Sequence, residues 1–206
     1  MTPWLVLATA NPGKRAEFQL LLAGLGYGIR DLADYPGITL PPEGGVSYAE
    51  NALAKARATA AVTGAVTLGD DSGLEVDALG GRPGVASARY GGPGVSDAAR
   101  VARLLAEMVG AGARGARFRC VLALVGPWGA EETVEGVVEG LLAETPRGHG
   151  GFGYDPIFLV PGLGRTLAEL TPAEKARMSH RGQAAARVRP ILTEWLPRAR
   201  GWTRPG

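Results

Sequence analysis

The first segment that could do chemistry follows a short apolar run and consists of Thr9, Ala10, Asn11, Pro12, Gly13 and Lys14. An apolar run followed by Asn and Pro predicts a strand that leads into a helix capped by the Asn. Backbone N–H groups and the positive end of a helix at such a turn attract phosphate. The segment therefore predicts a phosphate-binding loop, with a capped turn and a solvated lysine as the plain alternative.

Two adjacent carboxylates follow another apolar run, in Gly69-Asp-Asp-Ser-Gly73. Neighbouring carboxylates at the end of a strand repel each other unless a cation or strong donors compensate them, and Mg²⁺ prefers oxygen ligands. The pair Asp70-Asp71 therefore predicts a Mg²⁺ site, to which either carboxylate could contribute. Glu43 could add an oxygen but has no signal of its own. The alternative is an ordinary turn, because turns use the same residues.

Lysine and asparagine are scarce in this chain. The three lysines are Lys14, Lys55 and Lys175, against nineteen arginines, and the two asparagines are Asn11 and Asn51. Arginine does not replace lysine at every site, so each of these five residues is a candidate for a role that arginine or aspartate would fill badly. Asn51 and Lys55 are four residues apart on a predicted helix and point in a common direction. A solvated helix face is the alternative for this pair.

A glycine-rich segment, Gly150-Gly-Phe-Gly-Tyr-Asp155, places two aromatic residues beside a carboxylate. An aromatic face can stack on a nucleobase, and exposed loop backbone can hydrogen-bond its edge. Loop aromatics more often pack into the nearest core, so this segment alone decides little. Cations and a hydroxyl donor follow at Lys175, Ser179, His180 and Arg181. Taken together, these segments supply phosphate donors, metal carboxylates and a base platform, the parts of a nucleoside triphosphate site.

The elements that must position these segments alternate between strand and helix early in the chain, and strands adjoin strands later. We expect strands at 4–8, 66–70, 74–76, 118–125, 133–142 and 157–160, and helices at 12–24, 48–63, 97–109, from 171, and 183–196. This pattern predicts an α/β (mixed α+β) fold, an elongated mixed sheet flanked by helices with two lobes and a central nucleotide cleft. Residues 1–196 would form one such domain, and residues 197–206 a frayed tail.

Composition excludes several classes of protein. A formal net charge of +2 gives no strong field for a nucleic-acid polymer, and no run approaches the roughly 20 apolar residues of a membrane helix. Cys120 is the only cysteine, so it forms no internal disulfide, which indicates a reducing compartment. We expect a cytoplasmic protein with neither a nucleic-acid nor a membrane partner.

Six motifs, in order along the chain, closely resemble the inosine triphosphate pyrophosphatase family, whose bacterial members are dITP/XTP pyrophosphatases. They are Thr9-Ala-Asn-Pro-Gly-Lys14, Glu50-Asn51 with Lys55-Ala56, Asp70-Asp-Ser-Gly73, Ser87-Ala-Arg-Tyr90, Gly151-Phe-Gly-Tyr-Asp-Pro156 and Ser179-His-Arg-Gly182. The resemblance implies hydrolysis of non-standard purine nucleoside triphosphates (ITP, dITP, XTP) to the monophosphate and pyrophosphate, which cleanses the nucleotide pool. It also implies a need for Mg²⁺ and a homodimer.

The resemblance assigns roles to individual residues. Residues 9–14 would hold the triphosphate, Glu43 and Asp71 would help to bind Mg²⁺, and Asp71 would also accept a proton. Ser72 would contact the substrate. The nucleotide pocket would be lined by Phe152, Gly153, Tyr154, Asp155, Lys175, His180 and Arg181. His149 departs from the family pattern, in which we expect a small or hydroxylated residue.

Two rival functions stay open from the sequence. A related pyrophosphatase could prefer other modified or ordinary nucleotides, and a regulator could bind a triphosphate without cleaving it. The pair Asp70 and Asp71 argues against the regulator, because a pure binder gains little from carboxylates placed beside phosphates.

Overall fold

The chain is described here by a computed structural model that covers residues 2–44 and 47–203. It divides into two compact units built from interleaved segments. Unit 1 takes the residues up to Asp71, then Cys120–Glu135, then those from Gln183 onward. Unit 2 takes Ser72–Arg119 and Gly136–Gly182.

The strands form a six-stranded mixed sheet in the order β2-β1-β3-β4-β5-β6. Their bounds are β1 Trp4–Leu7, β2 Gly28–Asp31, β3 Val66–Val76, β4 Gly115–Val125, β5 Glu131–Leu142 and β6 Phe158–Leu159. Strand β1 pairs in parallel with β2 and β3, whereas β5 and β6 are antiparallel. The predicted α/β class with a mixed sheet is confirmed. Strand β2 was not predicted, because its four residues Gly-Ile-Arg-Asp lack an apolar run.

The five α-helices of the described residues are α1 Pro12–Leu21, α2 Tyr48–Thr63, α3 Asp97–Glu107, α4 Pro172–Met178 and α5 His180–Gly201. Short 3₁₀ segments lie at η1 Leu32–Asp34, η2 Asp77–Leu79, η3 Gly84–Arg89, η4 Asp155–Ile157 and η5 Leu167–Glu169. Asn11 caps α1, as predicted, and the side chains of Ser47, Ser96 and Thr171 cap α2, α3 and α4. Not one of these helices combines the length and the apolarity that crossing a bilayer requires.

Helix α5 extends further in both directions than its sequence predicts. It begins at His180 and continues through Pro190 and Pro197 to Gly201, so the expected end at Leu196 is wrong. The aromatic residues around it explain the extension. The rings of Trp195 and Trp202 pack at 5.4 and 5.9 Å from that of Trp128, and the Arg198 guanidinium lies 4.8 Å from the same ring. These contacts stabilise the C-terminal part of the helix, which Pro197 would otherwise weaken.

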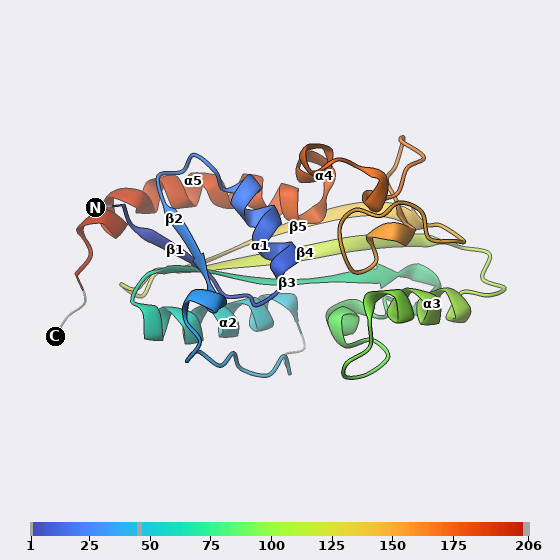
Figure 1. Cartoon of the computed structure of the whole chain (residues 1–206), viewed down its shortest axis with the longest axis horizontal. Helices are drawn as coiled ribbons and strands as arrows, with labels where there is room; N and C mark the ends of the chain where they lie inside the picture. The colour runs from blue at the N-terminus through green and yellow to red at the C-terminus, as the bar shows by residue number, and fades with distance from the viewer. Residues whose placement is uncertain (1, 45–46, 204–206) are drawn as a thin grey trace. The chain divides into compact units, whose positions relative to one another are not determined.

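The core of unit 1 lies on both faces of β1 and β3. Figure 1 shows α1 and α5 on one face of these strands and α2 on the other. The first face is filled by large apolar side chains that include Leu5, Leu7, Phe18, Leu68 and Leu192. The second face meets small residues, since α2 presents Ala52, Ala56 and Ala60, all buried. Successive residues of a strand point to opposite faces, so β3 carries different chemistry on each side.

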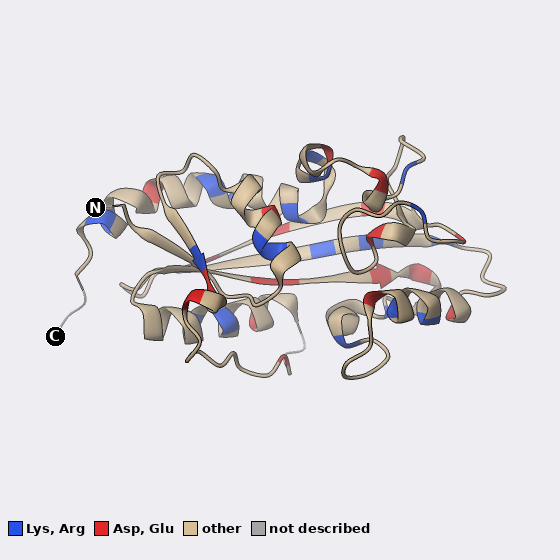
Figure 2. Ribbon diagram, viewed as in Figure 1, with Lys and Arg blue, Asp and Glu red and all other residues tan. Residues whose placement is uncertain are grey.

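Unit 2 packs the apolar stripe of α3 against its strands. Val101, Leu104 and Met108 lie in a buried cluster with Phe118 and Phe158. Other strand positions carry ion pairs, in which Arg117 contacts Asp77 and Glu139, both at 2.9 Å. Figure 2 shows the resulting acidic segments on β3 and basic segments on β4. Glu139 is exposed on β5.

The absence of a side chain at Gly69 sets how closely α2 approaches β3. A Cβ atom built there would collide with the backbone carbonyl oxygen of Ala52 and would lie 3.1 Å from the Cβ of Ala56. The small residues of α2 and Gly69 together bring the helix backbone against the strand. Residues that follow Gly69 on β3 are thereby brought within reach of polar side chains on α2.

We predict that Gly69→Ala destabilises the fold by about 1–3 kcal/mol, because the added methyl group forces backbone atoms apart. Chemical denaturation followed by circular dichroism measures this change. Gly37→Ala is the matched control, since a Cβ at Gly37 meets nothing within 4 Å and its φ is not in the left-handed region. Equal stability of the two variants would contradict the close approach.

Candidate functional site

The loop of residues 9–14 lies where β1 ends and α1 begins, as predicted. Asn11 Oδ1 accepts hydrogen bonds from the N–H groups of Gly13 and Lys14, at 2.8 and 3.2 Å. Thr9 Oγ1 accepts from the N–H of Asn11 at 3.1 Å. Thr9 is buried, whereas Ala10, Asn11 and Pro12 are exposed. Side chains therefore hold the turn in shape and leave its tip in solvent.

Asp71 is a buried carboxylate that side chains of α2 neutralise. Its Oδ1 contacts the ammonium of Lys55 at 3.1 Å, and its Oδ2 accepts from the Asn51 amide at 3.0 Å. The same ammonium contacts Glu43 Oε1 at 2.8 Å. Lys55 thus joins two carboxylates, and both its side chain and that of Asp71 are only 5 % exposed. We call Glu43, Asn51, Lys55 and Asp71 the acidic cluster.

Burial and charge act against each other in the acidic cluster. Desolvation by burial raises the pKa of Asp71 above its usual range, although Lys55 and Asn51 lower it. For Lys55, burial alone would lower the pKa, but the charges of Asp71 and Glu43 outweigh burial and the pKa is raised. Lys55 therefore stays charged, and Asp71 is a stronger base than an exposed aspartate.

Asp70 has a different set of partners from Asp71. It forms an ion pair with Lys14 of α1, and its Oδ2 accepts from the Cys120 thiol of β4 at 3.2 Å. The two aspartates lie within β3, which continues to Val76, so their predicted place at the end of a strand is wrong. Each points to its own helix because neighbours on a strand face opposite ways. This arrangement separates two charges that are adjacent in sequence.

In unit 2, Asp155 connects the glycine loop, residues 148–153, to helix α4 through a hydrogen bond and a buried ion pair. Lys175 Nζ contacts Asp155 Oδ2 at 2.5 Å, and the same oxygen accepts from the N–H of Phe152 at 2.8 Å. The Lys175 ammonium lies 4.9 Å from the centre of the Phe152 ring. Asp155 therefore fixes a lysine and the backbone of an aromatic residue at once.

Helix α4, which carries Lys175, has an N-terminus capped by side chains. Thr171 and Glu174 form a reciprocal capping box, with Pro172 in the first turn. The side chain of Arg165 and the N–H and hydroxyl of Thr171 hold the pKa of Glu174 at about 2. Glu174 is therefore ionised at any physiological pH, and the start of this short helix keeps its cap.

Arg181 and His180 occupy buried but different surroundings at the start of α5. Arg181 donates to Ser72 Oγ at 2.9 Å, and its guanidinium lies 5.5 Å from the Phe152 ring. His180 stacks on Phe118, with ring centroids 4.6 Å apart and planes 11° apart. Phe152, Lys175 and Arg181 thus form an aromatic–cation cluster with Ser72, whereas the structure sets His180 against a core ring.

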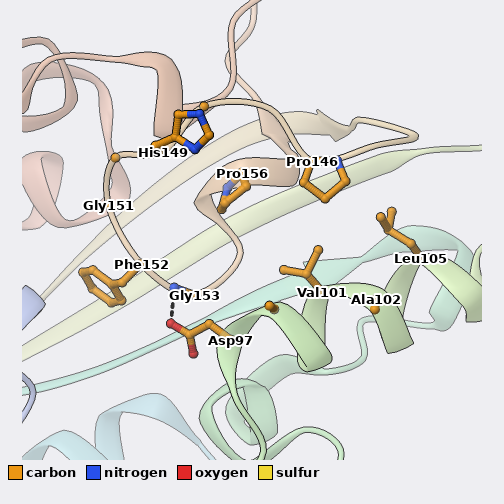
Figure 3. A pocket seen from close by; sticks show the side chains of 13 residues that line it. Asp97, Val101, Ala102, Leu105, Pro146, His149, Gly151, Phe152, Gly153 and Pro156 are labelled. Carbon is orange, nitrogen blue, oxygen red and sulfur yellow. Dashed lines mark hydrogen bonds between the residues drawn. The ribbon is translucent and has the colours of Figure 1, made fainter.

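A pocket of about 750 Å³ opens on the α3 side of the glycine loop (Figure 3). Its walls are Val101, Ala102 and Leu105 of α3 together with the loop and the prolines that flank it. His149, the residue that departs from the expected pattern, is exposed and lines this pocket. Tyr154 points elsewhere, since it is buried and its hydroxyl donates to the Ser87 carbonyl oxygen at 3.1 Å.

No group of three or more His, Cys, Asp or Glu side chains within residues 2–44 and 47–203 stands close enough together to hold a metal ion. Two carboxylates do meet around one positive charge, at Glu43 and Asp71. Carboxylate oxygens are the ligands that Mg²⁺ prefers. The chemistry of this donor set therefore suits a hard divalent cation.

The structure brings together residues that local sequence signals could not connect. Lys55 contacts both predicted metal ligands, Glu43 and Asp71, whereas the sequence marked it by its rarity, its spacing from Asn51 and its motif but did not indicate these contacts. Cys120 and Asp97 gave no chemical signal at all, because their partners Asp70 and Gly153 are 50 and 56 residues away along the chain. Contacts of that separation follow from the fold and not from a motif.

The model of the Ham1 family matches residues 5–191. The chain belongs to the Ham1 family. The resemblance drawn from the six motifs is thereby confirmed. It rests on most of the chain and includes every segment that contributes to the two clusters.

Among curated proteins, a dITP/XTP pyrophosphatase of Methylococcus capsulatus is 54 % identical over 188 residues, 88 % of this chain and 92 % of that protein. One from Exiguobacterium sp. is 48 % identical over 96 % of this chain and 99 % of its own length. Among solved structures, a HAM1 protein from Coxiella burnetii superposes with a TM-score of 0.84 at 43 % identity, covering 93 % of this chain and 99 % of that one.

We predict that Lys55→Met destabilises the fold by about 3 kcal/mol, because it leaves two neighbouring carboxylates without their shared cation. Adding Asp71→Asn to this variant should restore part of the loss, since it removes one of the uncompensated charges. Urea denaturation of the single and double variants measures the coupling.

Arg57→Met is the matched control on the same helix. Arg57 pairs with Glu131 at the surface, where the side chains are 56 % and 34 % exposed, so its loss should cost less than about 1 kcal/mol. If Lys55→Met is no more destabilising than Arg57→Met, the acidic cluster does not depend on Lys55 in the way described.

Proposed function

We propose that this protein hydrolyses non-standard purine nucleoside triphosphates, ITP, dITP and XTP, to the monophosphate and pyrophosphate. The observation that carries the proposal is Asp71, a buried carboxylate of raised pKa fixed by Lys55 and Asn51. A positioned carboxylate of this kind is suited to take a proton from water. Membership of the Ham1 family and the names of its relatives point to the same reaction.

The loop of residues 9–14 is the proposed triphosphate site. Backbone N–H groups at the start of α1 and the positive end of the helix favour phosphate oxygens. Lys14 adds a charge that is only partly buried and is already balanced by Asp70. If the triphosphate formed the ion pair with Lys14 in place of Asp70, Asp70 would keep its hydrogen bond from the Cys120 thiol. Asp70 would then shape the site and would not bind the substrate directly.

Mg²⁺ is the proposed metal, held by Glu43 and Asp71, with Asp70 as a less favoured ligand. When bound, Mg²⁺ would offset the negative charge of the triphosphate and of the departing pyrophosphate. Glu43 and Asp71 carry two negative charges against the single positive charge of Lys55, and this excess of negative charge supports a cation site beside the two carboxylates.

The chain's own groups account for the remaining chemistry. Asp71 would accept a proton from a water molecule, whose oxygen then forms a bond to the α-phosphorus while the bond to the pyrophosphate oxygen breaks. Asn51 and Lys55 keep Asp71 in one orientation, so little reorganisation is needed when charge develops. Lys14 would stabilise the charge that collects on the leaving pyrophosphate.

The aromatic–cation cluster is the proposed recognition site for the purine. Phe152 would stack on the base, and Gly153, Tyr154 and Asp155 would line the pocket through the loop backbone. Donors near Arg181 and His180 suit a keto oxygen at the purine 6-position, whereas an amino group would leave such donors unpaired. This difference is the proposed basis for preferring ITP over ATP.

A homodimer, a cytoplasmic location and the absence of nucleic-acid or membrane partners complete the proposal. The homodimer follows from the family resemblance, and the cytoplasmic location from the single cysteine. The near-neutral charge argues against a nucleic-acid partner, and the lack of a long apolar run argues against a membrane partner. Light scattering on the purified chain measures its molar mass, and a monomer at micromolar concentration would remove the dimer from the proposal.

We predict that the purified chain with Mg²⁺ releases pyrophosphate and the monophosphate from ITP, dITP and XTP, and that a chelator abolishes turnover. Incubation with ITP, XTP, GTP, ATP and dUTP, followed by separation of the products, checks this. Equal rates on ATP and ITP would favour the first alternative, a related pyrophosphatase that also acts on ordinary nucleotides. Orthophosphate as product would contradict the reaction, and binding without turnover would favour the regulator.

We predict that Asp71→Asn lowers kcat by at least about 100-fold, because the amide cannot accept a proton from water. Calorimetric titration should still detect nucleotide binding, since Asn keeps the size of the side chain. Asp77→Asn is the control, an exposed aspartate whose partner is Arg117. Near-normal turnover of Asp71→Asn would exclude Asp71 as the base.

A further inference from the structure

The glycine loop cannot position Phe152 by secondary structure. Gly148, Gly151 and Gly153 all have φ in the left-handed region, at 80°, 72° and 61°, and the described residues between them form no helix or strand. Chain of this kind has many accessible conformations, so its geometry depends on contacts with other elements.

On one side, buried groups hold the loop. Asp155 Oδ2 accepts the N–H of Phe152 at 2.8 Å and is itself paired with Lys175. Gly150 donates its N–H to the carbonyl oxygen of Ala168 at 2.9 Å. These bonds fix the loop toward α4 and η5.

On the other side lies the pocket of about 750 Å³, so the loop does not pack closely against α3 there. One hydrogen bond crosses at its edge. Asp97 Oδ2 accepts from the N–H of Gly153 at 2.7 Å, and Figure 3 shows this bond between α3 and the tip of the loop beside Phe152. A charged acceptor makes it stronger than a bond between neutral groups.

Asp97 is well placed to act as an anchor. It is the first residue of α3, whose Val101 and Leu104 are buried in the core of unit 2. Its other oxygen pairs with Arg100, which restrains the carboxylate. The side chain is 47 % exposed, so the bond competes with water and its contribution is moderate.

We propose that Asp97 is a positioning residue for the purine site, and that it acts by fixing the peptide between Phe152 and Gly153. That peptide carries the N–H that Asp97 accepts, and its orientation sets the backbone from which the Phe152 ring projects toward Lys175 and Arg181. The inference rests on the proposed function, in which Phe152 stacks on the base.

The test compares steady-state kinetics of Asp97 variants on ITP. We expect Asp97→Ala to raise KM about 10-fold and to change kcat less than about 3-fold, because binding of the base is affected and Asp71 is not. Asp97→Asn retains an acceptor oxygen and should recover most of the affinity. Arg100→Gln removes only the ion pair to Asp97 and should leave KM within about 2-fold of the native value.

A double-mutant cycle with Phe152→Ala shows whether Asp97 acts through Phe152. If it does, adding Asp97→Ala to Phe152→Ala raises KM by less than about 2-fold, whereas additive effects would overturn the inference. Amide hydrogen exchange gives a readout without nucleotide. Residues 150–154 should exchange faster in Asp97→Ala than in the native chain, and equal rates would also overturn it.

The two levels of failure are distinct. A native chain that makes no pyrophosphate from ITP would remove the proposed function, and with it the role of Phe152. A native chain that is active on ITP, with an Asp97→Ala variant of unchanged KM, would overturn only the inference about Asp97.

Discussion

The organisation of unit 1 depends on one electrostatic constraint, the burial of the Asp71 carboxylate. A carboxylate removed from water needs compensation, and the fold supplies it from α2 through Lys55 and Asn51. Those contacts require the helix backbone to lie against β3, which in turn requires glycine at position 69 and alanines on the facing side of α2. The close packing of α2 on β3 and the neutralisation of the Asp71 charge therefore depend on the same residues.

The same solution recurs with each of the three lysines. Lys14 pairs with Asp70, Lys55 with Asp71, and Lys175 with Asp155, and all three aspartates are buried. An ammonium is a compact point charge with three rotatable donors, so one lysine can serve several oxygens at once. The scarcity of lysine in a chain rich in arginine therefore has a structural counterpart. Surface pairs such as Arg57 with Glu131 use arginine instead.

The sequence predicts what local chemistry determines. The caps at Asn11, Ser47 and Thr171 occur where their residue types indicated, and so do most strands, because side chain and backbone interact within a few residues. The opposite directions of Asp70 and Asp71 were not predicted, since their segment resembled a turn and the strand in fact continues. The hydrogen bond from the Gly153 N–H to Asp97 could not be predicted either, because it depends on where α3 packs.

The two clusters are built on different supports, and this difference suits their proposed tasks. The acidic cluster draws Asp71 from a strand and Lys55 from a long helix, elements that hold charges within tight limits, as a proton transfer requires. The aromatic–cation cluster takes Phe152 from a glycine loop fixed by two carboxylates, Asp155 and Asp97. Stacking tolerates small displacements of the ring better than proton transfer tolerates displacement of a base. A loop anchored at two points therefore allows recognition to vary while the chemistry stays fixed.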